Sequence, residues 1–138
     1  MPENNPIKNQ LREERREERF GENAACAVCG YSKPAGLTLV RNSFLEEHHI
    51  FGRANDPETT VPLCLNCHRE VTEAARSAGA AMKPSANCLE RFQSMLRALG
   101  GFLIILGQRM LAWADEVTSF IFGLDHSHSG WRKMPEAN

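Results

Sequence analysis

The chain has 138 residues, which suits one small domain with an appendage. Its formal net charge is −1 and charged residues make up 24%, so no global basic charge points to a nucleic-acid partner, and any attraction to a polyanion must be local. Residues 1–10 contain no apolar segment of a secretory signal, and the most apolar stretch, 101–107, is too short to span a bilayer. We therefore expect a cytoplasmic protein that makes no membrane contact.

A charged arm occupies residues 1–22. Its run from Leu11 to Arg19 places Glu and Arg three or four residues apart, which predicts a solvated helix. A helix that contacts DNA or a partner protein is the alternative for this segment.

Residues 23–80 combine short strand-like runs with one helical run, and this pattern indicates the α+β class. Strands are expected at 37–41, 44–48 and 59–63, and a helix at 69–80. Pro62 favours an edge position for its strand, because proline has no N–H to donate to a neighbouring strand.

Residues 81–124 are helical in pattern, with a break expected at Gly100 and Gly101. Beyond the break, apolar residues alternate spacings of three and four in a heptad-like seam: Leu103, Leu106, Met110, Trp113, Val117, Phe120 and Leu124. These helices can pack on the domain or on each other, form a homodimer through residues 101–124, or meet another partner or a membrane surface.

Residues 125–138 are expected to be a flexible tail. His126 and His128 fit a solvated tail better than a metal site, and Trp131 can be a local anchor.

Two cysteine pairs carry the strongest pattern, Cys26-x2-Cys29 and Cys64-x2-Cys67. Two such turns can place four thiolates around one Zn²⁺ in a closed tetrahedral site, which is structural because no coordination position stays open. Disulfides, an iron–sulfur site and coincidence are the alternatives. Cys88 stands apart and is expected to be a small buried hydrophobe.

Three histidines lie near these cysteines. His48 and His49 end an expected strand, and His68 directly follows the last cysteine. Adjacent strand residues point to opposite sides, so His48 and His49 should have different roles.

The sequence resembles the HNH endonuclease family in its zinc-stapled ββα-metal form, over roughly residues 26–73. The resemblance rests on three segments: Glu47-His48-His49-Ile50, Gly52-Arg53-Ala54-Asn55-Asp56, and Val61-Pro62-Leu63-Cys64-x2-Cys67-His68. It implies that His48 and His68 bind a catalytic divalent metal and that His49 is the general base.

Two positions depart from the family pattern. Thr59 stands where the family has an Asn that orients the base, so its hydroxyl, or the backbone, would have to take that catalytic role. Thr72 stands where some relatives have a third histidine ligand, and Glu70 or Glu73 could help to hold the metal instead.

The resemblance implies a metal-dependent nuclease that hydrolyses phosphodiester bonds in DNA, double-stranded DNA above all, as a nickase or endonuclease. The catalytic ion could be Mg²⁺, Mn²⁺, Ni²⁺ or Zn²⁺, and bacterial, phage and mobile-element settings all fit. Arg41, Arg53 and Arg69 can contact phosphate or can be ordinary surface arginines. The alternatives are a catalytically degenerate zinc-binding module that binds DNA or protein, and a helical assembly protein capped by a zinc domain.

Overall fold

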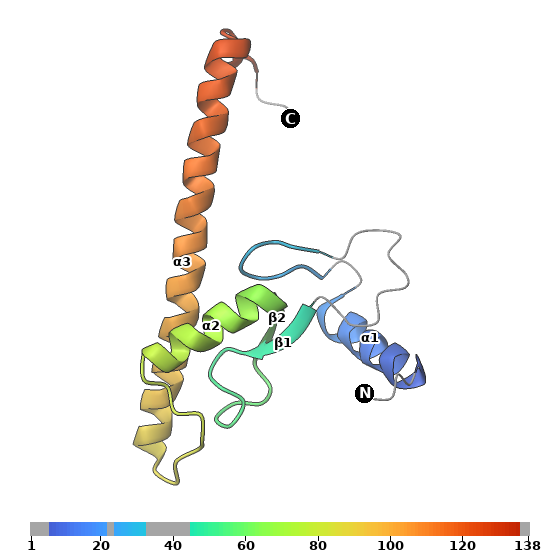
Figure 1. The fold of residues 1–138 in the computed structure, drawn as a ribbon, viewed down its shortest axis with the longest axis vertical. Helices are drawn as coiled ribbons and strands as arrows, with labels where there is room; N and C mark the ends of the chain where they lie inside the picture. The colour runs from blue at the N-terminus through green and yellow to red at the C-terminus, as the bar shows by residue number, and fades with distance from the viewer. Residues whose placement is uncertain (1–5, 22–23, 33–44, 136–138) are drawn as a thin grey trace. The chain divides into compact units, whose positions relative to one another are not determined.

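The computed structural model describes residues 6–21, 24–32 and 45–135. It has mixed α+β architecture, which confirms the expected class: two strands, three α-helices and a short 3-10 helix (Figure 1). The chain divides into unit 1, residues 1–105, and unit 2, residues 106–138. The strand expected at 37–41 and the candidate phosphate contact Arg41 lie outside the described residues.

The sheet of unit 1 is one antiparallel hairpin. Strand β1, Leu45–His49, pairs with β2, Thr60–Cys64, so that His49 lies opposite Thr60 and Leu45 opposite Cys64. Both strands lie within one residue of the runs expected from the sequence. A two-stranded sheet is marginal in water by itself, so its order depends on what packs against it.

Helix α2, Leu65–Ser77, follows β2 without a loop and covers the hairpin. It begins four residues before the expected 69–80 helix, because Cys64 is its N-cap and Cys67 lies in its first turn. The centre of the core is apolar: Val28, Leu63 and Val71 are fully buried. Burial of a few aliphatic side chains makes a small core.

Helix α1, Pro6–Phe20, carries the charged arm. Near its end Arg19 donates to the Glu47 carboxylate at 3.3 Å and to the Glu58 carbonyl at 2.9 Å. The arm is therefore joined to the hairpin through one arginine, while most of its described side chains face solvent.

Helix α3, Cys88–Ser127, runs without interruption through Gly100 and Gly101, so the expected break is wrong. Close packing explains why a glycine stands there. A Cβ at residue 101 would lie 2.6 Å from the backbone nitrogen of Ala75 in α2, whereas one at residue 100 would meet nothing within 4 Å. Gly101 thus lets two helix backbones touch, and this contact outweighs the low helix propensity of glycine.

The first part of α3 belongs to unit 1, and its buried residues there are Ser94, Ala98, Gly101 and Phe102. The Ser94 hydroxyl accepts a hydrogen bond from the backbone N–H of Ala81 at 2.9 Å. Cys88, expected to be buried, is exposed, because it is the first residue of the helix, next to Asn87, whose side chain accepts from the N–H of Leu89. That expectation is corrected.

Unit 2 contains the end of α3 and the 3-10 helix Trp131–Lys133. The segment expected to be a flexible tail begins inside α3 and folds back locally, since Trp131 Nε1 donates to Asp125 at 2.8 Å and Arg132 donates to the same carboxylate. Trp131 is thus the local anchor that the sequence suggested.

Helix α3 contains an 18-residue window with a mean hydropathy of 1.4, long and apolar enough by length and composition to cross a membrane. One such helix is weak evidence, and 17% of this window is buried inside the protein. The absence of a membrane contact stays a prediction.

Candidate metal centre and histidine cluster

The first cysteine pair is held by a tight turn. The N–H of Gly30 donates to the carbonyl of Cys26 at 2.8 Å, and the N–H of Cys26 donates to Tyr31 at 2.7 Å. Gly30 adopts φ +72°, a left-handed conformation that side-chain-bearing residues rarely tolerate. This turn aims the sulfurs of Cys26 and Cys29 toward the same point.

The second pair straddles the junction of strand and helix. Cys64 ends β2, and Cys67 lies in the first turn of α2, where it is 2% exposed. The two pairs are joined through the backbone as well, because the N–H of Ala27 donates to the carbonyl of Pro62 at 2.9 Å. Pro62 therefore lacks a donor but supplies the acceptor that fixes the first turn to the hairpin.

The four cysteines converge, as the spacing predicted. Their sulfurs all lie within 4.8 Å of one another, none is in a disulfide, and the four could hold a metal ion. The sulfurs of Cys29 and Cys64 are 3.8 Å apart, which matches the edge of about 3.8 Å in a tetrahedron with Zn–S bonds of about 2.3 Å. Within the described ranges this is the one cluster of three or more Cys, His, Asp or Glu ligand atoms this close together.

The electrostatics of the thiols also fit a cation. Burial raises the pKa of Cys26, but hydrogen bonds from the backbone of Cys29, Cys64 and Val28 outweigh it and lower the value to about 7. Burial, followed by the neighbouring sulfurs, raises the pKa of Cys67 well above its usual range. The thiol of Cys26 therefore loses its proton easily, whereas the thiol of Cys67 resists losing its proton unless a positive charge is bound nearby. This is the behaviour expected of a metal site.

Period-two alternation along β1 sorts the residues around the histidines into two sets. Glu46 and His48 both contact His68 of α2, whereas Glu47 accepts from Arg19 of α1, and Glu47, His48 and His49 all line one cavity. His48 is 8% exposed and lies between two rings: His68, with ring centroids 5.1 Å apart, and Phe102, at 6.3 Å. Burial, then His68 and His49, lowers the pKa of His48 to about 4, so its ring is neutral at physiological pH.

Glu46 orients His68. A carboxylate oxygen of Glu46 lies 2.6 Å from His68 Nδ1, which places the proton on Nδ1 and leaves Nε2 as the free lone pair. This carboxylate–histidine arrangement is common for metal-binding histidines. Glu46 was missed by the sequence reading, although its position two residues before His48, on the same strand face, was a usable signal.

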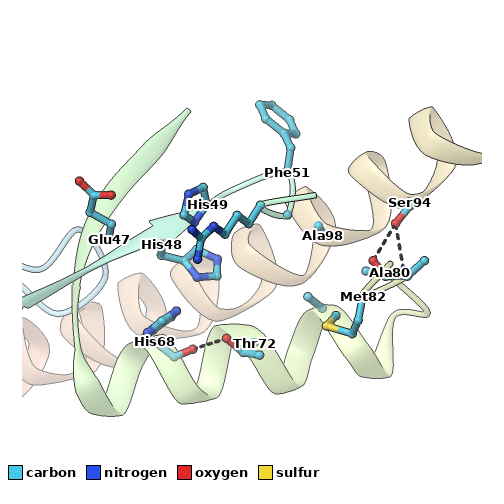
Figure 2. Close-up of a pocket in the computed structure, with 14 residues that line it drawn as sticks. Glu47, His48, His49, Phe51, His68, Thr72, Ala80, Met82, Ser94 and Ala98 are labelled. Atoms are coloured by element: carbon cyan, nitrogen blue, oxygen red, sulfur yellow. Dashed lines mark hydrogen bonds between the residues drawn. The ribbon is translucent and has the colours of Figure 1, made fainter. Parts of the chain in front are cut away.

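All three histidines line one cavity of about 330 Å³, together with residues of α2, α3 and the 80–82 loop (Figure 2). His49 enters from the far face of β1. Burial, then the charge of Arg53, lowers the pKa of His49, so the unprotonated ring that a general base needs is favoured. The structure thus brings together His48, His49 and His68, the histidines singled out in the sequence.

The threonines at the two departing positions have partners elsewhere. The Thr59 hydroxyl donates to Asp56 at 2.6 Å, and the Thr72 hydroxyl donates to the carbonyl of His68 at 2.8 Å. Thr59 therefore shapes the 56–59 turn, where its hydrogen bond also lowers the pKa of Asp56. The loop after His49 is held instead by Asn55, whose amide donates to the carbonyl of Phe51 at 3.2 Å.

The remaining candidates differ in position. Arg53 lines the cavity, whereas Arg69 is exposed on α2. Glu73 accepts from Arg76 at 2.6 Å on the exposed side of α2, and Glu70 is exposed on the same helix. The carboxylate that contacts a histidine ring nitrogen at hydrogen-bond distance is that of Glu46, on β1.

Comparison of the chain with protein-family models, curated proteins and solved structures finds no match in any of the three.

Proposed function

We propose that the chain is a metal-dependent nuclease of the HNH type, with a structural zinc on the four cysteines and a hydrolytic site on the three histidines. The observation that carries the proposal is the shared cavity: a buried neutral His48, a carboxylate-oriented His68 and a more exposed His49 open into one space. The β1–loop–β2–α2 order that supplies them is the one implied by the sequence resemblance.

Each side chain has a separate task in this proposal. His48 and His68 Nε2 would hold a divalent cation, which would supply charge neutralisation at the phosphate and the leaving oxygen. His49 takes a proton from a water molecule as the water oxygen forms a bond to phosphorus. The bond from phosphorus to the leaving oxygen breaks, the leaving oxygen gains a proton from solvent, and the products are a phosphate monoester and a hydroxyl end.

Arginines near the cavity mouth are suited to bind the DNA backbone. Arg53 lines the cavity, and Arg19 reaches the hairpin through Glu47 and Glu58. Local cations of this kind can attract a polyanion even though the net charge of the chain is −1.

Plasmid cleavage tests the proposal. Purified protein with supercoiled DNA and Mg²⁺, Mn²⁺ or Ni²⁺ should give nicked or linear product, and His49→Ala should lower the rate by about 10²–10⁴-fold. His126→Ala, an exposed histidine of unit 2, is the matched control and should cleave at the wild-type rate. An inactive wild type with every metal, or an equally active His49→Ala, excludes the nuclease.

A catalytically degenerate zinc module is the second candidate. It is favoured by Thr59, whose hydroxyl is directed to Asp56 and not to the base, and by the third-ligand position Thr72, whose hydroxyl is bound to the backbone of α2. This candidate predicts that DNA or protein binding is unchanged in a His49→Ala, His68→Ala double variant, which separates it from the nuclease.

A further inference from the structure

Unit 2 presents an apolar surface along its helix. Large side chains that are 40–70% exposed follow one another there: Met110, Leu111, Trp113, Val117, Phe120 and Phe122. The residues at 106, 110, 113, 117, 120 and 124, called the seam below, alternate spacings of four and three, the repeat of helices that pair side by side. The opposite side of this helix, called the back, carries the polar residues Gln108, Asp115 and Ser119 but also the exposed Leu111 and Phe122, so the seam is a continuous apolar stripe on a helix whose back is mixed.

The size of the seam suits a protein–protein contact. The seam has four exposed apolar side chains and two half-buried ones, Leu106 and Leu124, so on the order of 100 Å² from each exposed side chain gives roughly 400–500 Å² per copy and roughly 1,000 Å² for a pair, the lower limit for a specific interface. A patch of this area is at the upper end of what soluble monomers leave in water, where such patches are often functional.

The charges around the seam favour a second copy over a lipid surface. Helices that lie on membranes usually carry several Lys or Arg on the polar face. Here the polar residues between 106 and 124 include one cation, Arg109, and two anions, Asp115 and Glu116. Such a face has no excess positive charge for anionic lipid, but it is complementary to itself.

Self-complementarity also selects the direction of pairing. Arg109 and Glu116 are seven residues apart, so they occupy the same flank of the seam, one heptad from each other. In a parallel pair this flank faces the partner's other flank, where residues 107, 114 and 121 are Gly, Ala and Ile. In an antiparallel pair the flank faces its own copy, and Arg109 of each chain can meet Glu116 of the other.

The same charges choose one register. Suppose that Leu106 packs beside Val117 of the partner and Met110 beside Trp113. The two Arg109–Glu116 pairs then form, one on each side of the two-fold axis. A slip of one heptad in either direction would oppose Arg109 to Arg109 or Glu116 to Glu116. Like charges in that position are unfavourable, so they act against the neighbouring registers.

We propose that residues 106–124 of α3 bind the same segment of a second copy, antiparallel, and that the protein is a homodimer. The proposal is independent of the proposed function, since it rests on unit 2 alone. If the nuclease is also correct, each assembly carries two histidine clusters, and two cuts on one DNA molecule can follow from one binding event.

Sedimentation of the full chain tests the dimer. Wild type and His49→Ala should both sediment at twice the 15.4 kDa chain mass, whether or not they cleave DNA. A Trp113→Glu, Val117→Glu double variant should be monomeric at the same concentration, while Gln108→Glu, Ser119→Glu on the back should stay dimeric. A monomeric wild type, or loss of the dimer in the Gln108→Glu, Ser119→Glu control alone, overturns the proposal.

A charge exchange tests the orientation. Arg109→Glu should weaken the dimer by roughly tenfold, because two surface ion pairs become two repulsions, and adding Glu116→Arg should restore the wild-type dissociation constant. Cross-linking in a Cys88→Ser background gives the register: Val117→Cys should form a disulfide dimer when mixed with Leu106→Cys, and not by itself. Self-cross-linking of Val117→Cys would show a parallel pair, and flotation of the protein with phosphatidylglycerol vesicles as a monomer would show a membrane surface; either result rejects the antiparallel dimer.

Discussion

The four-cysteine site and the histidine cluster are built on the same hairpin and helix, yet they differ in nearly every physical property. The cysteines form a closed set whose sulfurs lie within 4.8 Å of one another, while His48 and His68 stand at the wall of a 330 Å³ cavity with their ring centroids 5.1 Å apart. Cys67 and His68 are consecutive residues of α2, about 100° apart around its axis, so one can face the core and the other the cavity. A closed site such as the four-cysteine site can stabilise the fold, whereas an open site such as the histidine cluster can exchange ligands.

The largest expected effect is on the closed site. Zinc removal, or Cys67→Ser, should abolish cooperative folding of unit 1, since structural zinc contributes about 10–16 kcal/mol in small domains, as much as the whole stability of a typical protein. Metal analysis should find one zinc per chain, and circular dichroism should follow the loss of structure during dialysis against a strong chelator.

Cys88→Ser is the matched control, because Cys88 is exposed and lies outside the cluster. It should keep its zinc and its unfolding temperature. If the chain stays folded with all zinc removed, folding of unit 1 does not depend on a metal at the four cysteines.

The buried histidine should make stability depend on pH. Because the pKa of His48 is lowered to about 4 and that of an unfolded histidine is about 6.5, the unfolded chain binds the extra proton between these values. Stability should therefore fall as the pH is lowered from about 6.5 to about 4, by roughly 2 kcal/mol from this ring after allowance for solvent in the cavity.

Denaturant unfolding of wild type and His48→Gln at pH 7.5 and pH 4.5 measures this contribution. Protonation of the thiols affects both proteins, so the difference between them isolates His48. If the difference in unfolding free energy between the two proteins does not change with pH, the pKa of His48 is the same in the folded and unfolded chain.

In the open site, Glu46→Gln should weaken binding of a second divalent ion by about tenfold, the lower end for loss of an outer-shell partner, because the amide oxygen still accepts a hydrogen bond. Calorimetry with Mn²⁺ or Ni²⁺ on the zinc-loaded protein measures the affinity. Glu73→Gln changes a carboxylate on the exposed side of α2, outside the cavity, and should leave the affinity as it is; equal losses in both variants would reject the positioning role of Glu46.

The smallest expected effect concerns the helix that walls the cavity. Gly101→Ala would place a Cβ 2.6 Å from Ala75 and should lower the free energy of unfolding by about 1 kcal/mol, as overpacking outweighs the gain in helix propensity. Gly100→Ala meets nothing within 4 Å and should raise it by up to about 1 kcal/mol. Equal effects in the two variants would show that α3 does not lie against α2.

The sequence predicted the features that depend on spacing. The convergence of four cysteines, the two hairpin strands and the meeting of three histidines all follow from local patterns, since two CxxC turns and a period-two strand leave few alternatives. The start of α2 was placed late, because the Cys64-x2-Cys67 turn was read as a separate knuckle and not as the first helical turn.

The features that depend on packing were not predicted. Gly101 was interpreted as a helix breaker, although only the backbone of Ala75 explains it, and Cys88 was expected in a core that the helix start does not reach. The contact of Glu46 with His68 joins residues 22 apart in sequence, so the strand position of Glu46 beside His48 could suggest a role for Glu46 but could not identify its partner. Secondary-structure propensity describes one helix or strand at a time, whereas the positions of these residues depend on contacts with a second helix or strand.

The junction of Cys67 and His68 restricts how such a chain can evolve. The 50–59 loop can lengthen or shorten at little cost, because its ends are held by the hairpin. A single inserted residue between the last thiol and the imidazole would instead turn the imidazole by about 100° around the helix. A change of length at this step would therefore move the imidazole away from the cavity, whereas the two ends of the 50–59 loop would stay in place.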